Sequence, residues 1–272
     1  MQDSPDQLGI IGGGVMAESI LSRLLSQGLY RSDQILVSDV SAERLQYLAD
    51  HYQVRGVADN PLVAISSSIL ILAIKPQVFD QVAAQLRATT HAFPLVISIL
   101  AGVSLARLET AFGDTPLVRV MPNTPAQVGA AMTAIALGKQ AKVHHQEQVQ
   151  QLFTAIGEVV TVPESLMDAV TGLSGSGPAF VAMVLEALAD GGVAVGLPRS
   201  MAAQLALQTL LGTALLVRET GIHPAQLKDQ VTSPGGTTIA GVAALEKAGL
   251  RGALMDAVQA AYQRSQQLGA DR

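Results

Sequence analysis

The chain has 272 residues, enough for one large domain or two moderate ones with a substantial buried core. Hydrophobic residues make up 49% and charged residues only 14%, which excludes a disordered chain, and the net charge of −5 argues against a nucleic-acid-binding protein. The absence of cysteine excludes disulfides, thiolate catalysis and cysteine-bound zinc. Residues 1–7 are polar and acidic, unlike a secretory signal, and we expect a cytoplasmic protein.

The first element combines an apolar run with glycines. Residues 8–11 predict a buried strand that leads into Gly12-x-Gly14-x-x-Ala17, and residues 18–27 predict a helix. This strand–turn–helix pattern is typical of a dinucleotide pyrophosphate site. Gly12 permits a tight turn, Gly14 leaves room for a phosphate, and Ala17 lets the helix pack closely. The alternative is a glycine-rich turn that binds no ligand.

Short β-branched runs then alternate with helix-like segments as far as residue 162. The predicted strands cover residues 34–38, 69–73, 95–99, 117–120 and 158–162, and the predicted helices cover residues 42–51, 79–86, 105–112 and 146–156. This alternation predicts a Rossmann-type, doubly wound and mainly parallel sheet with helices on both faces. A ligand is then expected beyond the carboxyl ends of the strands.

The composition changes after Pro163, where segments rich in alanine, leucine and methionine predict only helices. These cover residues 164–173, 178–195, 199–220, 224–230, 237–248 and 250–268. We therefore expect a dinucleotide-binding domain over residues 1–163 and an all-α domain over residues 164–272. Residues 200–217 carry no charge, and glutamines and threonines interrupt the apolar run. This favours a helix in a subunit interface over one that crosses a membrane.

Asp39 closes the second predicted strand, where an acidic residue commonly hydrogen-bonds the adenosine ribose. Facing the 2′ position, it would repel a 2′-phosphate by about 4 kcal/mol at a separation of roughly 4 Å and an effective dielectric constant near 20. Arg44, one turn into the next helix, could pair with either group and reverse this preference. Alternatively, Asp39 only caps the helix that begins near Ser41.

Four further segments end strands or join helices. Pro76 stops the strand predicted over residues 69–73 and brings Lys75 to the ligand edge, unless Lys75 is an ordinary exposed lysine. Residues 98–102 and 121–125 should face the nicotinamide half of the crevice, and the two prolines of the latter predict a rigid turn in which a cis bond can occur. Residues 171–178 lie between two predicted helices, where their glycines permit either close ligand approach or tight helix packing.

Residues 232–238 form a second candidate anion site. Ser233 can cap a helix and Pro234 can occupy its first position, which leaves the following amides free for a small carboxylate. Thr237 and Thr238 add hydroxyl groups, whereas the alternative is a capped surface helix. His144 and His145 are adjacent and point to different helix faces, so we expect a solvated helix start and no metal site.

Taken together, these motifs resemble the pyrroline-5-carboxylate reductase family over nearly the whole chain. The most specific parts are residues 170–179 and 233–238, and residues 73–76 and 121–125 are also in place. The resemblance implies a Rossmann domain followed by a helical domain that forms a homodimer, often assembled further into a decamer. It also implies a small-molecule substrate, 1-pyrroline-5-carboxylate, and no nucleic-acid or membrane partner.

The resemblance assigns site residues one by one. The cofactor-binding residues expected from it, together with Asp39, are Ile11, Gly12, Gly13, Gly14, Val15, Met16, Asn60, Ala73, Ile74, Lys75, Pro76, Ile99, Leu100 and Ala101. The substrate-binding residues are Ser233, Gly235, Gly236, Thr237 and Thr238, and the Thr238 hydroxyl is the catalytic group that reaches the ring nitrogen.

Three positions depart from the family pattern. Val15 stands where bacterial members frequently have asparagine, and Leu100 stands where alanine is common, which would narrow the nicotinamide pocket. The family commonly prefers NADPH, whereas Asp39 argues for NADH, so the sequence leaves both cofactors open.

The resulting hypothesis is hydride transfer from NAD(P)H to the C=N bond of 1-pyrroline-5-carboxylate, the final step of proline biosynthesis. A 3-hydroxyacid dehydrogenase has a similar layout but usually uses a lysine base on the first long helix, and residues 164–198 contain no lysine. A non-catalytic dinucleotide-binding regulator is the alternative of another class, although it would have no use for a carboxylate-binding loop.

Overall fold

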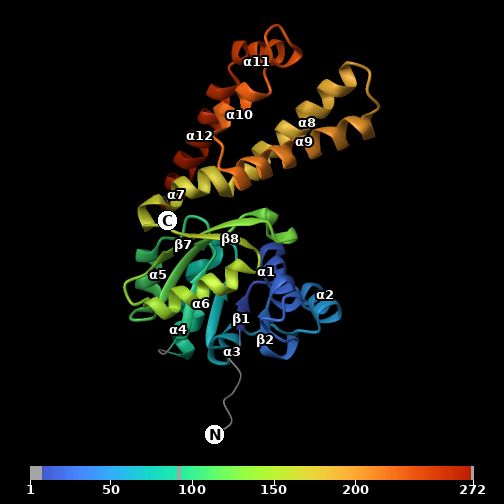
Figure 1. Cartoon of the computed structure of the whole chain (residues 1–272). Coiled ribbons are helices and arrows are strands. Elements are labelled where there is room, and N and C mark those ends of the chain that lie inside the picture. Colours follow the sequence, from blue (N-terminus) through green and yellow to red (C-terminus); the bar gives the residue numbers. More distant parts are fainter. Residues whose placement is uncertain (1–7, 91–92, 271–272) are drawn as a thin grey trace. The chain divides into compact units, whose positions relative to one another are not determined.

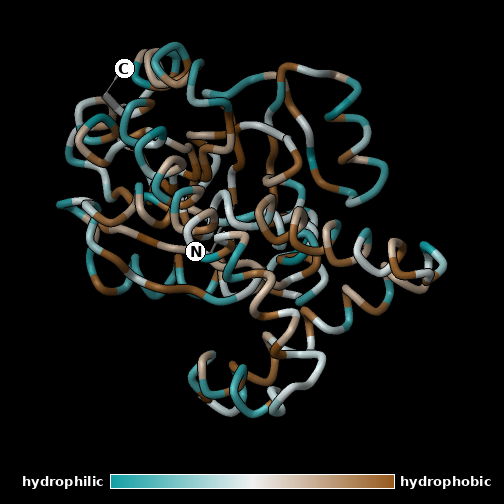
Figure 2. Tube along the Cα trace, turned by 90° about the horizontal axis from the view of Figure 1, so that it is seen from above, coloured by the Kyte–Doolittle hydropathy of each residue, from teal (hydrophilic) through white to brown (hydrophobic). Residues whose placement is uncertain are grey.

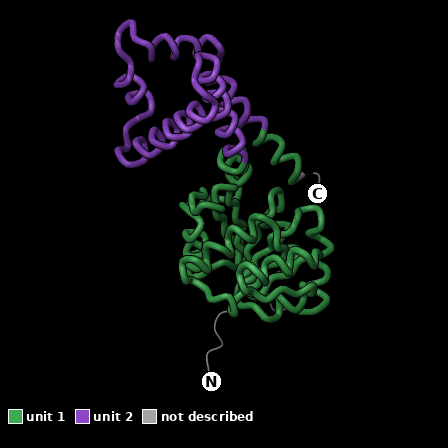
Figure 3. The backbone as a smooth tube through the Cα atoms, turned by 90° about the vertical axis from the view of Figure 1, so that its right-hand side faces the viewer, with its two compact units in different colours: residues 1–175, 261–272 green, residues 176–260 purple. Residues whose placement is uncertain are grey.

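The computed structural model describes residues 8–90 and 93–270. Residues 1–7, in which no secretory signal is expected, lie outside the described residues. The chain forms two compact units, one made of residues 1–175 and 261–272 and the other of residues 176–260 (Figure 3). The predicted division at residue 163 is a functional one and stays a prediction.

The first unit is built on one sheet of eight strands (Figure 1). The strands are β1 (Leu8–Ile11), β2 (Ile35–Ser38), β3 (Arg55–Val57), β4 (Ile69–Leu72), β5 (Leu95–Ser98), β6 (Leu117–Met121), β7 (Ala131–Leu137) and β8 (Gly157–Thr161). They lie in the order β3-β2-β1-β4-β5-β6-β7-β8, and β6 and β7 form the antiparallel pair among them. The predicted Rossmann-type, mainly parallel sheet is therefore confirmed.

Two hydrophobic cores lie on the two faces of this sheet. One contains the apolar residues of α1 (Val15–Ser26), α2 (Ala42–Tyr52) and α6 (Val143–Thr154). The other contains those of α3 (Asn60–Ile65), α4 (Phe79–Thr89) and α5 (Leu105–Phe112). Hydrophobic stretches gather along the middle of this unit in Figure 2. Because both faces are covered, the central strands are buried along their whole length, as their continuous apolar runs predicted.

Strand order reverses beside β1, which pairs with β2 on one side and with β4 on the other. The chain leaves β1 toward one face of the sheet and leaves β4 toward the other, so a crevice opens at their carboxyl ends. The glycine-rich turn after β1 and residues 73–76 after β4 both lie at this point. The topology thus brings together two segments that the sequence predicted as cofactor contacts.

Four elements differ from the sequence-based expectations. The first helix begins at Val15 rather than residue 18, and β3, β7 and α3 were not predicted. Strand β7 has the sequence AMTAIAL, whose alanines do not favour a strand locally, and it forms because it pairs with both β6 and β8. Strand β3 and helix α3 are too short for a periodic pattern.

The glycine-rich residues after 170 were expected to separate two helices, and this is wrong. Helix α7 (Met167–Val170) is followed by a π-helical stretch, Thr171–Gly175, and then by α8 (Gly177–Ala194). A π-helical stretch keeps the backbone hydrogen-bonded while it shifts the helix register, so no open loop is needed here.

The second unit consists of helices alone. Besides α8 it contains α9 (Arg199–Thr220), α10 (Pro224–Gln230), α11 (Thr237–Lys247) and the first half of α12 (Leu250–Ala270). Its buried hydrophobic residues are all alanines, namely Ala189, Ala202 and Ala206, where α8 packs on α9. Two helical stretches, Glu164–Ala194 and Arg199–Thr220, are long and apolar enough to cross a membrane by length and composition. Only about a tenth or less of either stretch is buried in this single chain.

Candidate active site

The glycine-rich turn after β1 has the geometry that its sequence predicted. Gly12 has φ +98°, and a Cβ added there would lie 2.6 Å from the Ala73 carbonyl oxygen, so only glycine fits. Gly14 is the N-terminal cap of α1, no side chain caps this helix start, and a Cβ at Gly14 would meet no described atom within 4 Å. Ala17 is buried against the sheet. Open amides, free space and the positive helix end fit a pyrophosphate.

A cavity of about 1010 Å³ adjoins this turn. It brings together several predicted cofactor residues, which are Ile11, Gly12, Gly14, Asp39, Asn60, Ala73, Ile74 and Lys75. Val78, Val82 and Gln85 of the region around α4 complete one wall of the cavity. Its volume is ample for the adenosine half of a dinucleotide, because drug-sized ligands occupy pockets of roughly 300–1,000 Å³.

Asp39 contacts the glycine-rich turn directly. Its Oδ2 accepts a hydrogen bond from the Gly13 amide at 2.7 Å, and its Oδ1 accepts one from the Ser41 amide at 2.9 Å. The cap of α2 is Ser41, whose hydroxyl accepts from the Arg44 amide. Asp39 therefore fixes the turn and also lines the cavity. Its contact with a ribose stays a prediction.

Asn60 and Lys75 lie after two different strands and line the same cavity. Asn60 follows β3, and Lys75 follows β4. Asn60, the first residue of α3, accepts a hydrogen bond from the Ser38 hydroxyl at 2.7 Å and donates one to Gln85 at 3.3 Å. Lys75 is exposed at the cavity edge, and Pro76 begins a short 3₁₀ helix there. The predicted turn that lifts Lys75 to the ligand edge is thus present.

Residues 99–101 follow β5. They were expected to face the nicotinamide, but the Leu100 side chain is buried. The Ile99 amide donates to the Leu72 carbonyl at 3.1 Å, and Leu100 is 2% exposed within the hydrophobic core. Because the Leu100 side chain points into that core, any contact of residue 100 with a cofactor would have to come from its backbone.

Asn123 joins the turn after β6 to the π-helical stretch. Its side-chain amide donates to the Ser174 carbonyl at 3.0 Å, and its Oδ1 accepts from the Met132 amide at 2.9 Å. The cis bond that the two prolines would allow in residues 121–125 does not occur, since every peptide bond of the described residues is trans. The rigidity of this turn comes instead from Asn123, which satisfies two backbone groups at once.

The candidate substrate loop differs in detail from its prediction. Helix α11 begins at Thr237 with Gly236 as its cap, so Pro234 does not occupy the first helical position, and no side chain caps this helix. The Ser233 carbonyl accepts from the Gly236 amide at 3.1 Å, and Gly235 has φ +67°. This glycine turn replaces the expected Ser233 cap and leaves the first amides of α11 open toward an anion.

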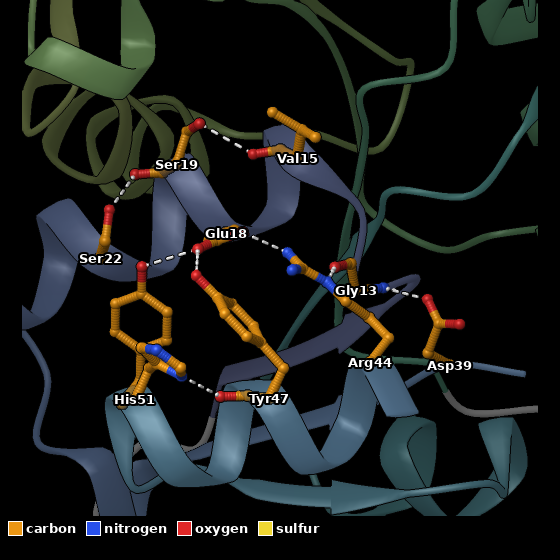
Figure 4. Close-up of polar contacts among 10 residues, drawn as sticks. Gly13, Val15, Glu18, Ser19, Ser22, Asp39, Arg44, Tyr47 and His51 are labelled. Carbon is orange, nitrogen blue, oxygen red and sulfur yellow. Dashed lines mark hydrogen bonds and ion pairs between the residues drawn. The ribbon is translucent and has the colours of Figure 1, made fainter. Parts of the chain in front are cut away.

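Sequence reasoning missed a polar cluster beside the glycine-rich turn, formed by Glu18, Arg44, Tyr47 and Tyr52 (Figure 4). Burial opposes ionisation of Glu18, yet hydrogen bonds from Arg44, Tyr52 and Tyr47 hold its pKa below the ordinary value. Burial and the hydrogen bond to Glu18 raise the pKa of Tyr52 to about 12. The sequence pattern that could have indicated this cluster is the spacing of Arg44 and Tyr47, which places both side chains on one face of α2.

His144 and His145 lie in the first turn of α6, where His145 Nδ1 accepts from the Lys142 amide at 3.0 Å. Burial, then the neighbouring His144 and Lys142, lower the pKa of His145. Across the described residues, the structure has no group of three or more histidine, cysteine, aspartate or glutamate side chains suited to a metal.

Two family models match this chain. Residues 164–268 match the model described as pyrroline-5-carboxylate reductase dimerisation, and residues 7–102 match the model described as NADP oxidoreductase, coenzyme F420-dependent. The chain is thus similar to a reductase family in its helical part and to NADP-dependent oxidoreductases in the part that carries the glycine-rich turn.

The similarity to named relatives extends over nearly the whole chain. A pyrroline-5-carboxylate reductase of Synechocystis is 59% identical over 97% of this chain and 98% of its own length, and one of Methanosarcina acetivorans is 47% identical over 97% and 98%. A solved reductase structure from Coxiella burnetii superposes with a TM-score of 0.89 at 32% identity, covering 97% of this chain and 99% of that chain. A Plasmodium falciparum pyrroline carboxylate reductase, solved with NADP bound, also has a TM-score of 0.89, at 29% identity over 97% and 98% of the two chains. Similarity of this extent, on a fold that holds an open glycine-rich cradle, places the chain in the pyrroline-5-carboxylate reductase family.

Proposed function

We propose that this protein reduces 1-pyrroline-5-carboxylate to L-proline with NAD(P)H, the final step of proline biosynthesis. The observation that carries this proposal is the similarity along the whole chain to relatives named for that reaction. The open cradle at Gly14 supports binding of a dinucleotide, and the uncapped start of α11 supports binding of a small carboxylate. Residues 1–163 would serve the cofactor, and residues 164–272 would serve the substrate and subunit association.

The proposed cofactor residues lie at or just beyond the carboxyl ends of strands β1 to β5. They are Ile11, Gly12, Gly13, Gly14, Val15, Met16, Asp39, Asn60, Ala73, Ile74, Lys75, Pro76, Ile99, Leu100 and Ala101. The proposed substrate residues are Ser233, Gly235, Gly236, Thr237 and Thr238. The backbone amides at the start of α11 would hold the substrate carboxylate without a cationic side chain.

Bound NAD(P)H supplies the hydride, which the imine carbon accepts while the ring nitrogen carries a proton. An imine nitrogen can be protonated before reduction, so the chain needs no strong general acid. Its residues instead orient the substrate so that the two carbons come within about 3–3.5 Å of each other. The Thr238 hydroxyl would hydrogen-bond the ring nitrogen and set this orientation.

We further propose a cytoplasmic homodimer, able to assemble into a decamer, with no nucleic-acid or membrane partner. Helices α8 and α9 expose leucines and methionines that a single chain leaves uncovered. The match of residues 164–268 to a dimerisation family supports a second copy as the partner that covers them. An apolar surface of this kind is expected at a permanent interface.

The role of Thr238 is tested by comparing Thr238→Ala with Thr238→Ser. We expect the alanine variant to lose roughly 10- to 100-fold in kcat, the effect of one catalytic hydrogen bond, while its Kd for the cofactor stays unchanged. The serine variant retains a hydroxyl and should keep most of the activity. Near wild-type turnover of Thr238→Ala would remove this hydroxyl from the mechanism.

The reaction itself is tested by cofactor oxidation in the presence of 1-pyrroline-5-carboxylate, with a 3-hydroxyacid and NAD(P)⁺ as the competing assay. We expect turnover with the pyrroline alone. Binding of NAD(P)H without any turnover would favour the regulator, and oxidation of the hydroxyacid would favour the dehydrogenase.

A further inference from the structure

Arg44 lies beside the glycine-rich turn, where an arginine can pair with the 2′-phosphate of NADP. In this structure its guanidinium has other partners (Figure 4). Arg44 Nε donates to the Gly13 carbonyl at 2.5 Å, and Nη2 forms an ion pair with Glu18 Oε2. The guanidinium also lies over the Tyr47 ring, 4.8 Å from its centroid. Three contacts therefore hold this side chain against α1 and the turn.

Glu18 is in turn held in a position to pair with Arg44. Its Oε1 accepts hydrogen bonds from the Tyr47 hydroxyl at 3.0 Å and from the Tyr52 hydroxyl at 2.8 Å. The side chains of Arg44 and Glu18 are only 24% and 21% exposed, so solvent screens their attraction less than that of a surface pair. Glu18 thus neutralises the positive charge of Arg44, whose Nε contacts the glycine-rich turn that adjoins the cavity.

Asp39 and Arg44 both contact Gly13 of the turn. The Asp39 carboxylate accepts a hydrogen bond from the Gly13 amide, and Arg44 donates one to the Gly13 carbonyl. Among Glu18, Asp39 and Arg44 the formal charge is −1, which disfavours an additional phosphate. We propose that Glu18 is a specificity-determining residue for the cofactor: by holding Arg44 on the Gly13 carbonyl it denies this arginine to a 2′-phosphate, and the protein consequently favours NADH. This inference rests on the proposed function, because it assumes that the cavity receives NAD(P)H.

The direct test measures the Kd values of NADH and NADPH for the full-length protein from the fluorescence of the reduced nicotinamide. The chain contains no tryptophan, so the signal has little protein background. Wild type should bind NADH more tightly. Glu18→Gln should tighten NADPH binding about tenfold, the effect of one charge-assisted hydrogen bond, and leave the Kd of NADH within about threefold.

Three further variants determine whether Arg44 causes this gain. Adding Arg44→Met to Glu18→Gln should abolish it, whereas Tyr47→Phe with Tyr52→Phe keeps both charges and should leave the cofactor ratio near that of wild type. Arg44→Met alone should leave NADPH affinity unchanged. A tenfold loss in that single variant would show that Arg44 already serves a 2′-phosphate, and either this result or an unchanged ratio in Glu18→Gln would overturn the inference.

Turnover of 1-pyrroline-5-carboxylate, measured on the same samples, separates this inference from the proposed function. If the protein turns over the substrate but its cofactor ratio does not respond to Glu18→Gln, the inference fails and the proposed reaction stands. If the cofactor ratio responds but no substrate turns over, the proposed reaction fails and the role of Glu18 stands.

Discussion

Asp39 has a structural role at the glycine-rich turn, and we propose that it also discriminates between the two cofactors. Its two carboxylate oxygens accept from the amides of Gly13 and Ser41, and the same residue lines the cavity beside the glycine-rich turn. The hydrogen bond to Gly13 engages one amide of the cradle, which leaves the amides at the start of α1 for the pyrophosphate. We therefore expect the charge of Asp39 to act on the adenosine end of a bound dinucleotide.

Replacing Asp39 by serine or asparagine should improve the use of NADPH. Both variants remove the negative charge, and asparagine also keeps the size and one acceptor oxygen, so it is the matched control for loss of the loop contact. We expect the ratio of kcat/KM for NADPH to that for NADH to rise about tenfold, less than the unscreened repulsion would give, because Asp39 is partly exposed. An unchanged ratio in both variants would mean that Asp39 points away from the ribose in the complex.

At the scale of elements, a buried arginine joins the sheet to the segments that follow it. Arg119 of β6 is 6% exposed and pairs with Glu164 at 2.6 Å, and its other terminal nitrogen lies 4.0 Å from Asp168 of α7. Glu164 also accepts from the Leu105 amide, and the Ser265 hydroxyl of α12 donates to Asp168 at 2.7 Å. One polar network thus connects β6, α5, the short 3₁₀ helix that contains Glu164, α7 and α12, and it was not predicted from the sequence.

Arg119→Met should destabilise the protein by about 2–3 kcal/mol, because it leaves the Glu164 carboxylate without its partner in a partly buried site. Arg31→Met is the matched control, since the Arg31–Asp33 pair is largely exposed and its loss should leave the free energy of unfolding nearly unchanged. The free energy of unfolding from urea titrations checks both variants. Equal losses in the two variants would contradict a structural role for the Arg119 network.

For the molecule as a whole, the two units differ in how they bury apolar side chains. The sheet unit has two cores that contain its large aliphatic and aromatic residues, whereas the 176–260 unit buries only small ones where α8 and α9 meet. Leu205, Leu207 and Leu211 of α9 stay about half exposed in the single chain. The helical unit therefore leaves most of its large apolar side chains exposed, and a second copy would bury them in the homodimer that we propose.

Combining Leu207→Glu with Leu211→Glu should prevent this association. These residues lie one turn apart on α9, and both side chains are about half exposed in the single chain. We expect a shift from dimer or larger species to monomer in sedimentation velocity, with a lower Tm. Val143→Glu introduces the same charge on an exposed valine of the sheet unit and should leave the mass unchanged. A dimer that survives the double substitution would place the interface elsewhere.

The sequence alone determined the features that depend on local chemistry. The turn at Gly12 needs a backbone conformation that only glycine adopts easily, and the apolar runs of β1, β4 and β5 can be buried only in a covered parallel sheet. Both ends of α9 and the start of α10 likewise agree with their predicted bounds, because proline and glycine mark them. These signals act within a few residues, so they are readable without the fold.

Tertiary structure decided whatever depends on partners distant in the sequence. Strand β7 forms through pairing with β6 and β8, the Glu18–Arg44 pair joins residues of two different helices, and Asp39 reaches Gly13 only because β1 and β2 are neighbours. No local pattern encodes these contacts, since an alanine-rich run or a single glutamate is compatible with many environments. The free energy of each contact depends on what the fold brings beside it.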